Sequence, residues 1–319
     1  MRLKLIPDNT TIPFTNWRFA AAGFSAMLVV ASIALLFSLG LNFGVDFRGG
    51  VTIEVAHQDP IDIGDVRSAV SALGLGDIKV QEIQDVAGAK KGVMVFIEQQ
   101  QASGDDREDE RAQQQASEQV QQALRDLVGD DIEFRRIDVV GPTVSGELIQ
   151  RGAMAVAIAI ALMLIYIWFR FEWQFSVGAI LALVHDVAIT MGMFAVTRLE
   201  FNLSIIAAIL TIVGYSMNDT VVVYDRVREN LRKYKKKPLR ELIDLSINDT
   251  LSRTVMTSMT TLLALGSLYM LGGAVLRGFT FAMIWGIVIG TYSSIFVASP
   301  LLLATGVKRD WSKQAAEGM

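Results

Sequence analysis

Six long apolar runs dominate the hydrophobic pattern of the chain. They cover residues 19–41, 152–169, 175–197, 201–224, 254–271 and 279–304. Each run is close to the roughly 20 residues that an α-helix needs to cross a bilayer, and a helix satisfies its own backbone hydrogen bonds, which lipid cannot do. The pattern predicts a polytopic α-helical membrane protein with six transmembrane helices.

A different pattern fills the stretch between the first two runs. Short apolar strands alternate with amphipathic helices in the order βαββαβ, at residues 51–55, 61–73, 78–83, 93–97, 106–127 and 132–140. This order favours an α+β ferredoxin-like domain, in which a four-stranded sheet carries two helices on one face. A disordered spacer is the alternative for this stretch. The acidic segment 104–110 is typical of a solvated turn, and a metal site is its other interpretation.

Basic residues near the ends of the runs indicate the orientation. The connection between the fourth and fifth runs is rich in lysine and arginine, whereas the connections after the third and fifth runs offer only Arg198 and Arg277. Cytoplasmic loops carry such an excess of positive charge. We therefore expect cytoplasmic ends at 1–18 and 307–319, a first transmembrane helix at 19–41, an extracytoplasmic domain at 42–150, and helices 2 to 6 at 151–306 with a basic cytoplasmic loop at 225–253.

The composition agrees with a membrane protein and excludes some chemistry. Hydrophobic residues make up 52% of the 319 residues and charged residues 19%, a balance too apolar for a soluble domain. The chain has no cysteine, which excludes disulfides, thiolate catalysis and cysteine-bound zinc. The first apolar run lacks the short core and small-residue cleavage site of a signal peptide, so we expect it to be a retained anchor.

Ionisable residues interrupt the third and fourth runs, where charge is costly and marks a functional site by default. His185 and Asp186 fall near the middle of the third run. Because neighbouring helical residues diverge by about 100°, we expect that the two side chains cannot both face one site directly. A structural polar lock between helices is the alternative role for this pair.

Asp219 in the fourth run is the main candidate for chemistry. Tyr215 lies one turn before it and is expected to donate a hydrogen bond to it, and Asn218 is its direct neighbour. Antiparallel packing of the fourth and fifth helices brings Arg253 near Asp219, and an arginine that approaches a carboxylate in one state and leaves it in another makes a proton switch. The alternatives are a static salt bridge at Asp219, and a surface pair between Asp249 and Arg253 at helical spacing.

The segment that joins the first run to the extracytoplasmic domain is expected to form an elbow. Gly44, Gly49 and Gly50 stand where the backbone must turn tightly, and Asp46 and Arg48 lie between them. On a strand, residues two apart share a face. We therefore expect Asp46 and Arg48 to pair with each other or to contact another subunit.

Four motifs together resemble a known family. They are GVDFRGG at 44–50, VHD at 184–186, GYSMNDTVVVYDRVREN at 214–230, and LSRTVMTSMTTL, which contains Arg253. In these motifs the chain is similar to the SecF members of the SecD/SecF family, accessory subunits of the bacterial Sec protein-export machinery. The likeness extends over almost the whole chain and is weakest around residues 99–122.

The resemblance implies a role and a set of partners. A SecF-like subunit would pair with SecD in a twelve-helix SecDF assembly, related in fold to resistance-nodulation-division exporters. It would use the proton motive force to promote late steps of preprotein translocation through the SecYEG channel, after the SecA motor. YajC and YidC are further expected partners. Asp219 and Arg253 fall on the family's proton-pathway positions.

The same resemblance implies the setting. We expect the bacterial inner membrane, with both termini cytoplasmic, the large loop periplasmic, and membrane lipid around the helices. Protons are the expected coupling ion. We expect no cofactor, no metal, no nucleic acid and no enzyme activity, because His57 is the only histidine in the exported domain and no acid, base or metal partner adjoins it in sequence.

Two other classes of function are considered. An autonomous proton-driven exporter of small molecules or lipids is the first, although such exporters usually carry both halves in one chain. An intramembrane aspartyl protease built on Asp186 and Asp219 is the second. It requires two carboxylates that face each other, and the surrounding motif does not match those enzymes.

Overall fold

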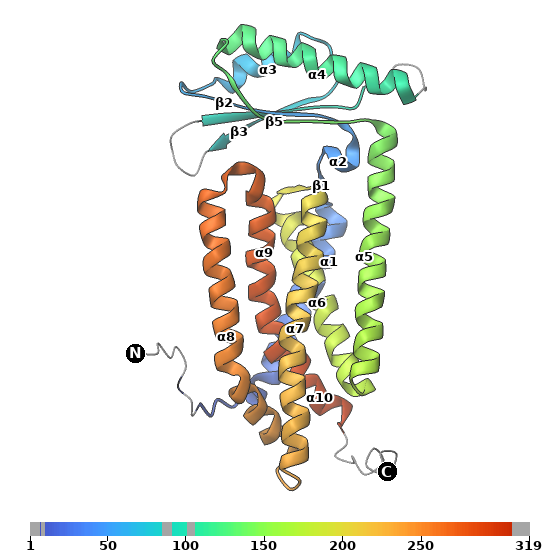
Figure 1. Ribbon diagram of the computed structural model, residues 1–319, viewed down its shortest axis with the longest axis vertical. Helices are drawn as coiled ribbons and strands as arrows, with labels where there is room; N and C mark the ends of the chain where they lie inside the picture. Colours follow the sequence, from blue (N-terminus) through green and yellow to red (C-terminus); the bar gives the residue numbers. More distant parts are fainter. Residues whose placement is uncertain (1–6, 8–9, 85–90, 101–105, 308–319) are drawn as a thin grey trace.

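The computed structural model describes residues 7, 10–84, 91–100 and 106–307. The rest of the two expected tails lies outside the described residues. Figure 1 shows a bundle of long helices with an α+β domain at one end of it. The described ends of the chain both lie at the opposite end of the bundle.

The bundle confirms the six predicted spans. Six helical stretches of the described part are long and apolar enough to cross a membrane. The first five are α1 (Arg18–Leu39, preceded by η1, Phe14–Trp17), α5 (Pro142–Arg170), α6 (Trp173–Thr197), α7 (Leu203–Lys233) and α8 (Leu239–Leu271). The sixth is made of α9 (Gly273–Ser293), the π-helical turn η2 (Ser294–Ala298) and α10 (Ser299–Thr305).

The basic connection differs from the expected loop. Residues 225–253 are helical apart from the short link 234–238, because α7 continues to Lys233 and α8 begins at Leu239. Arginine, lysine and glutamate are good helix formers, so the helices continue past the apolar segment. Pro238 then takes the N-cap position of α8. The prediction of a loop over 225–253 was therefore wrong, although its basic character stands.

The α+β domain has the predicted ferredoxin-like order. Its elements are β2 (Gly50–His57), α3 (Ile63–Ser71), β3 (Ile78–Gln84), β4 (Lys91–Ile97), α4 (Asp106–Val128) and β5 (Glu133–Val140). The sheet order is β3-β4-β2-β5 with antiparallel neighbours. Helices α3 and α4 cover one face, and the other face looks toward the bundle (Figure 1). The valines and isoleucines of β2 and β4 meet α3 and α4 in one apolar core.

The elbow forms, but its middle is a helical turn. After β1 (Asn42–Phe43), residues Val45–Arg48 make the short helix α2. Gly49 and Gly50 follow with φ of 71° and 125°, values that side chains with a Cβ rarely adopt. Asp46 and Arg48 therefore do not share a strand face, and no ion pair joins them in the described structure. That part of the elbow prediction was wrong.

Helix α7 lies at the centre of the bundle, where it contacts α5, α6, α8 and α9. Its approach to α9 is close. A Cβ on Gly286 would collide with the side chain of Ile212, and a Cβ on Gly290 would lie 3.0 Å from that of Ser216. Small residues at such positions let helices pack tightly in lipid, and here they place the polar residues of α7 against the sixth span.

Candidate functional site

Asp219 is a buried carboxylate held by two hydroxyl groups. Only 6% of its surface is exposed. The hydroxyl of Thr254 on α8 donates to Oδ1 at 2.7 Å, and that of Ser294 in η2 donates to Oδ2 at 2.5 Å. Three spans therefore meet at this side chain. Each carboxylate oxygen accepts from one neutral hydroxyl. When the carboxylate gains a proton, these hydrogen bonds can change without the breaking of an ion pair.

Asp186 forms a second buried site on the neighbouring helix. Its side chain is fully buried, and Oδ2 accepts hydrogen bonds from Ser216 of α7 at 2.5 Å and Ser293 of α9 at 2.7 Å. The imidazole Nδ1 of His185 lies 2.8 Å from Oδ1. The prediction that these two neighbours cannot face one site was wrong. Their Cα–Cβ directions diverge, but side-chain rotation brings their tips together.

The outer nitrogen of His185 is available for a further partner. Nε2 is buried and has no hydrogen-bond partner within the described ranges. The ring stacks on that of Tyr292, with centroids 6.0 Å apart. The pair thus contains one strongly bonded carboxylate and one buried nitrogen with an unused donor or acceptor site.

The π-helical turn η2 explains how one helix serves both carboxylates. Ser293 and Ser294 are adjacent, yet Ser293 donates to Asp186 and Ser294 to Asp219. A π turn inserts an extra residue into the helix and changes the direction of the side chains around it, and such turns are frequent at functional sites. The hydroxyl of Ser299 closes the turn by donating to the carbonyl oxygen of Ser294 at 2.7 Å.

Arg253 lies near Asp219 without touching it. Its side chain is exposed on α8, and no described residue forms a hydrogen bond or ion pair with its guanidinium. It directly precedes Thr254, whose hydroxyl donates to Asp219. The structure therefore brings the two predicted residues into one region and leaves the arginine unpaired there.

Two other expected contacts of Asp219 do not form. The hydroxyl of Tyr215 donates to Ser258 at 3.3 Å, and Ser258 is in turn 2.7 Å from the hydroxyl of Thr291. Helical side chains lean toward the N-terminus, so the Tyr215 ring leans away from a residue that follows it by one turn. Asn218 points outward and is exposed. Neither residue lines the Asp219 site.

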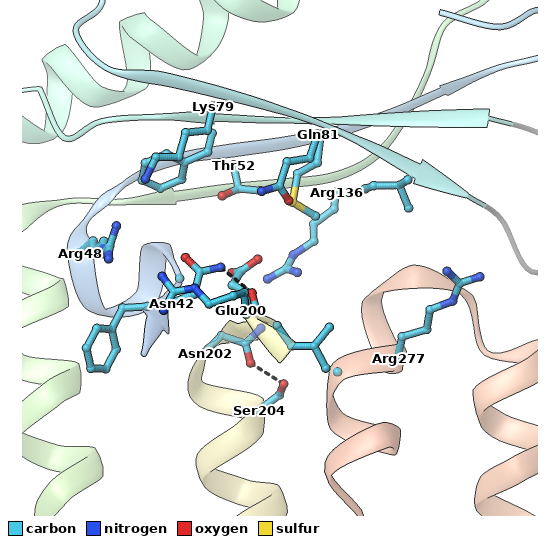
Figure 2. A pocket seen from close by; sticks show the side chains of 18 of the residues that line it. Asn42, Arg48, Thr52, Lys79, Gln81, Arg136, Glu200, Asn202, Ser204 and Arg277 are labelled. Atoms are coloured by element: carbon cyan, nitrogen blue, oxygen red, sulfur yellow. Dashed lines mark hydrogen bonds between the residues drawn. The ribbon is translucent and has the colours of Figure 1, made fainter. Parts of the chain in front are cut away.

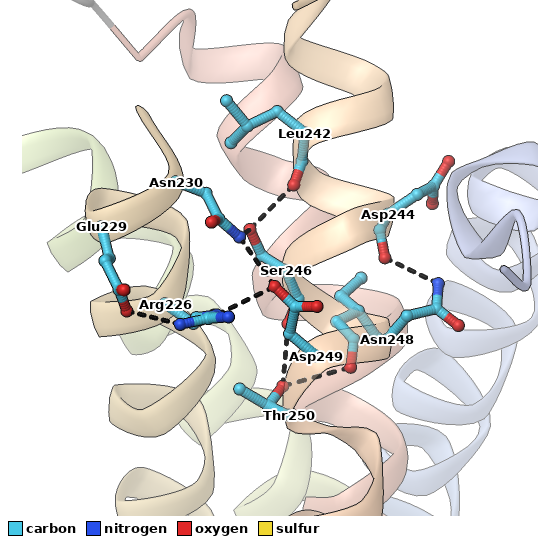
Figure 3. Close-up of polar contacts among 10 residues, drawn as sticks. Arg226, Glu229, Asn230, Leu242, Asp244, Ser246, Asn248, Asp249 and Thr250 are labelled. Atoms are coloured by element: carbon cyan, nitrogen blue, oxygen red, sulfur yellow. Dashed lines mark hydrogen bonds and ion pairs between the residues drawn. The ribbon is translucent and has the colours of Figure 1, made fainter. Parts of the chain in front are cut away.

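Asp249 has partners other than Arg253. Figure 3 shows Arg226 of α7 reaching across to Asp249 of α8, with Nε 2.9 Å from Oδ2. The amide of Asn230 donates to the same oxygen at 3.1 Å and to Ser246 at 3.0 Å. These contacts fix the ends of α7 and α8 that lie away from the α+β domain. The alternative pair between Asp249 and Arg253 is therefore not formed.

At the other end of α7, the elbow supplies a cap. The carboxylate of Asp46 accepts a hydrogen bond from the backbone nitrogen of Leu203, the first residue of α7, at 2.8 Å. The N-cap residue of this helix, Asn202, makes no capping bond with its own side chain. A carboxylate at a helix N-terminus accepts a hydrogen bond from a free N–H group, and its negative charge interacts favourably with the helix dipole. Asp46 thus ties the elbow to the helix that carries Asp219.

The C-terminal end of α1 is capped by an arginine from the link between α6 and α7. Arg198, which follows α6 with φ of 56°, donates to the carbonyl oxygens of Leu39 and Gly40 at 2.8 and 2.9 Å. A parallel bridge between β1 and β6 (Glu200–Phe201) joins the same two segments. The link between α6 and α7 is therefore bound to the link between α1 and the α+β domain.

Glu200 lies in a cavity between the sheet and the bundle. The cavity has a volume of about 280 Å³ and is lined by both parts of the molecule; Figure 2 shows Arg136 of β5 pointing down toward Glu200. The buried Oε1 of Glu200 has no hydrogen-bond partner in the described part of the chain, and a Cβ on Gly44 would collide with this oxygen. Burial raises the pKa of Glu200, and the charge of Arg136 opposes the shift.

Among the residues that the structure describes, no group of three or more His, Asp or Glu side chains could hold a metal ion. The residues that sequence reasoning missed are mainly hydroxyls. Ser216, Thr254, Ser293 and Ser294 complete the two carboxylate sites. The only signal for them in the sequence is a few small polar residues inside apolar runs.

Family models match two parts of the chain. The model described as "Protein export membrane protein SecD/SecF, C-terminal" matches residues 119–308, and "SecD/SecF GG Motif" matches residues 34–56. The second match contains the glycine elbow, and the first contains both carboxylate sites.

Individual relatives extend the match to the whole chain. "Protein translocase subunit SecF" of Rhodobacter capsulatus is 47% identical over 315 residues, which are 98% of this chain and 94% of that protein. "Protein translocase subunit SecDF" of Brucella abortus is 45% identical over 308 residues, which are 96% of this chain but 39% of that protein. The chain thus matches nearly all of one relative and a part of the other.

Two solved structures share the fold. The crystal structure of SecDF from Thermus thermophilus matches 95% of this chain with a TM-score of 0.79 and 35% identity, and the chain covers 40% of it. A structure of SecDF in "Super-membrane-facing form" matches with a TM-score of 0.66 and 35% identity, and the chain covers 41% of it. The chain corresponds to less than half of each SecDF structure.

Proposed function

Because the chain belongs to the SecD/SecF family of protein export membrane proteins, we propose that it uses the proton motive force to promote late steps of preprotein translocation through the SecYEG channel. The observation that carries this proposal is the buried carboxylate of Asp219, held by hydroxyls from two other spans next to an unpaired arginine. Its relatives are named as protein translocase subunits. No observation favours an autonomous exporter.

Protonation of Asp219 changes the hydrogen bonding between three spans. The ionised carboxylate accepts from both Thr254 and Ser294. A protonated carboxyl group carries a donor on one oxygen, and a hydroxyl can accept as well as donate, so one of the two hydroxyls must stop donating to that oxygen and can accept from it instead. Ser294 has a second acceptor at hand, because its hydroxyl lies 3.0 Å from the carbonyl oxygen of Thr291. The proton therefore reverses one of the hydrogen bonds that join α7 to the sixth span and to α8.

Arg253 completes the switch in this proposal. When Asp219 is ionised, the guanidinium is attracted to it, and when Asp219 is protonated the attraction is lost. Helix α7 carries the change to the elbow, since Asp46 binds the first residue of that helix.

The setting follows from the family and from charge. We propose that the chain pairs with SecD, since it corresponds to about 40% of the SecDF chains, and that it acts with SecYEG, SecA and translocating preproteins. YajC and YidC are further proposed partners. The basic residues of 226–240 support a cytoplasmic position for that end of the bundle. Both termini are then cytoplasmic, the α+β domain is periplasmic, and protons are the coupling ion.

The two buried carboxylates do not form a protease dyad. Asp186 and Asp219 are bonded to different hydroxyls, and no hydrogen bond or shared partner joins them among the described residues. A dyad requires two carboxylates that share one proton. We therefore keep Asp186 as a structural or supporting group of the proton path.

The test is Asp219→Asn, which keeps the shape but cannot exchange a proton. In membrane vesicles, we expect the variant to lose the part of preprotein translocation that depends on the proton gradient and to retain the part driven by ATP alone. Glu241→Gln, in the first turn of α8 and away from Thr254, is the matched control and should keep both. Gradient-dependent completion of translocation at the wild-type rate in Asp219→Asn would contradict the proposal.

A further inference from the structure

A deep apolar groove opens at the end of the bundle opposite the α+β domain. It lies between the first turns of α1 and the segment formed by η2 and α10, and its volume is about 610 Å³. Its walls are mostly apolar and include Phe19, Ala22, Leu181, Val297, Leu301 and Ala304. Phe19 of α1 and Leu181 of α6 are exposed on the outside of the bundle, so the groove faces the hydrocarbon region of the membrane. Its shape and lining fit an acyl chain.

Two arginines stand on the lining of this groove, Arg18 of α1 and Arg240 of α8. The guanidinium of Arg240 donates to Thr15 at 3.2 Å and to Asn16, and that of Arg18 lies 4.5 Å from the ring of Phe19. Among the residues that the structure describes, no carboxylate forms an ion pair with either arginine. The two guanidinium groups at the groove therefore have no direct ion-pair partner within the described chain.

The carboxylate of Asp244, one turn after Arg240 on α8, already accepts hydrogen bonds from another residue. Both oxygens of Asp244 accept hydrogen bonds from Thr15, one from its backbone nitrogen at 2.8 Å and one from its hydroxyl at 2.7 Å. An arginine carries five N–H groups, and Arg240 uses only two donor nitrogens for its two contacts. Both guanidinium groups thus keep N–H donors for an oxyanion, the bidentate geometry that suits a phosphate.

We propose that this groove binds an anionic phospholipid, with its phosphate on Arg18 and Arg240 and an acyl chain between α1 and α10. The leaflet is the one opposite the α+β domain, which is cytoplasmic if the orientation proposed above holds; the site itself does not depend on the proposed function. Basic pockets between transmembrane helices recognise the head groups of acidic lipids. Two arginines without an acidic partner favour a lipid with net negative charge over a zwitterionic one.

The lipid would also touch the back of the Asp219 site. Phe296 and Val297 of the π turn line the groove, and Ser294 of the same turn donates to Asp219. An acyl chain in the groove therefore packs against the turn that supplies a hydroxyl to the carboxylate. Lipid binding is expected to stabilise this turn in the conformation described here.

The first test measures lipid binding to the purified full chain. By native mass spectrometry, we expect the wild type to retain one phosphatidylglycerol molecule in preference to phosphatidylcholine. Arg18→Gln with Arg240→Gln should weaken that retention roughly tenfold or more, since both positive charges near the phosphate are lost. Arg232→Gln with Lys236→Gln removes two charges from the same end outside the groove, and it should have little effect.

A second variant and a second ligand separate the lipid from its phosphate. Ala22→Phe fills the groove and keeps both arginines, so it should also lose phosphatidylglycerol. Inorganic phosphate at the same concentration should not compete, because the acyl chain contributes most of the binding; competition would identify a free-phosphate site instead and overturn the proposal. Equal retention of the two lipids, or unchanged retention in the double arginine variant, would also overturn it.

Discussion

The cap that Asp46 places on α7 makes a quantitative prediction. Asp46→Ala removes the acceptor of the Leu203 N–H group, which now lies 2.8 Å from Oδ2. Loss of an N-cap acceptor costs about 1 kcal/mol and loss of the charge at the helix dipole roughly 0.3–1 kcal/mol. The first turn of α7 should therefore open more easily by about 1–2 kcal/mol, which is roughly a 5- to 30-fold change in the opening equilibrium.

Hydrogen exchange followed by mass spectrometry measures that equilibrium segment by segment. Peptides that cover 203–207 should exchange faster by this factor in Asp46→Ala. Asp46→Asn keeps an acceptor oxygen and should lose only the smaller, charge-dependent share. The control is Asp62→Ala, which removes the cap of α3, where Asp62 accepts from Gly64 and Asp65 at 2.6 and 3.2 Å. It should speed exchange in α3 alone.

The reasoning is refuted if Asp46→Ala leaves exchange over 203–207 within about twofold of the wild type, a difference too small for a lost cap. An equally large effect of Asp46→Asn would show that charge, rather than the acceptor oxygen, holds the helix. The first of these results would also remove the proposed mechanical link between α7 and the elbow.

Three further changes test other parts of the account. Burial raises the pKa of Glu200, so at pH values above the ordinary glutamate pKa of about 4.3 the folded chain binds more protons than the unfolded chain, and stability falls as the pH rises from there through the folded-state pKa. Glu200→Gln should therefore raise the melting temperature at pH 8 but not at pH 4. A shift of equal size at both pH values would contradict this. Arg253→Lys keeps the charge but loses the planar fork, so proton flux into vesicles, read with an internal pH dye, should fall, and wild-type flux would argue against the switch. Gly286→Ala places a Cβ against Ile212 and should cost about 1–3 kcal/mol of stability. Gly266→Ala has open space around its Cβ and should leave stability unchanged or raise it by up to about 1 kcal/mol; equal thermal shifts would refute the close α7–α9 contact.

The features that depend on local periodicity could be predicted from the sequence. Apolar runs of sufficient length predicted the six spans, and the order of strands and helices predicted the ferredoxin-like sheet, since few topologies close that order. Asp219 stood out because charge is rare in an apolar run. Helix ends were less predictable: α7 continues to Lys233 through charged residues that favour helix as strongly as apolar ones do.

The partners of the buried carboxylates could not be predicted in the same way. Ser293 and Ser294 reach two different carboxylates only because the sixth span contains a π turn, and an apolar pattern carries no sign of an extra residue in a turn. His185 and Asp186 meet because their side chains rotate. The angle of about 100° between neighbouring helical residues describes only the directions in which the side chains leave the backbone. Tyr215 was misplaced because a shared helix face does not fix the direction in which a long side chain leans.

The central claim is that Asp219 is the group that gains and loses the proton. Infrared difference spectroscopy on the chain in lipid, between alkaline and acidic buffer, detects the C=O stretch of a newly protonated carboxyl group in water-poor surroundings. Glu200 is a second buried carboxyl group with a raised pKa, so the measurement uses a Glu200→Gln background. The account predicts that the band is present in this background, is lost when Asp219→Asn is added and remains when Asp249→Asn is added. Persistence of the same band in Asp219→Asn would contradict the claim.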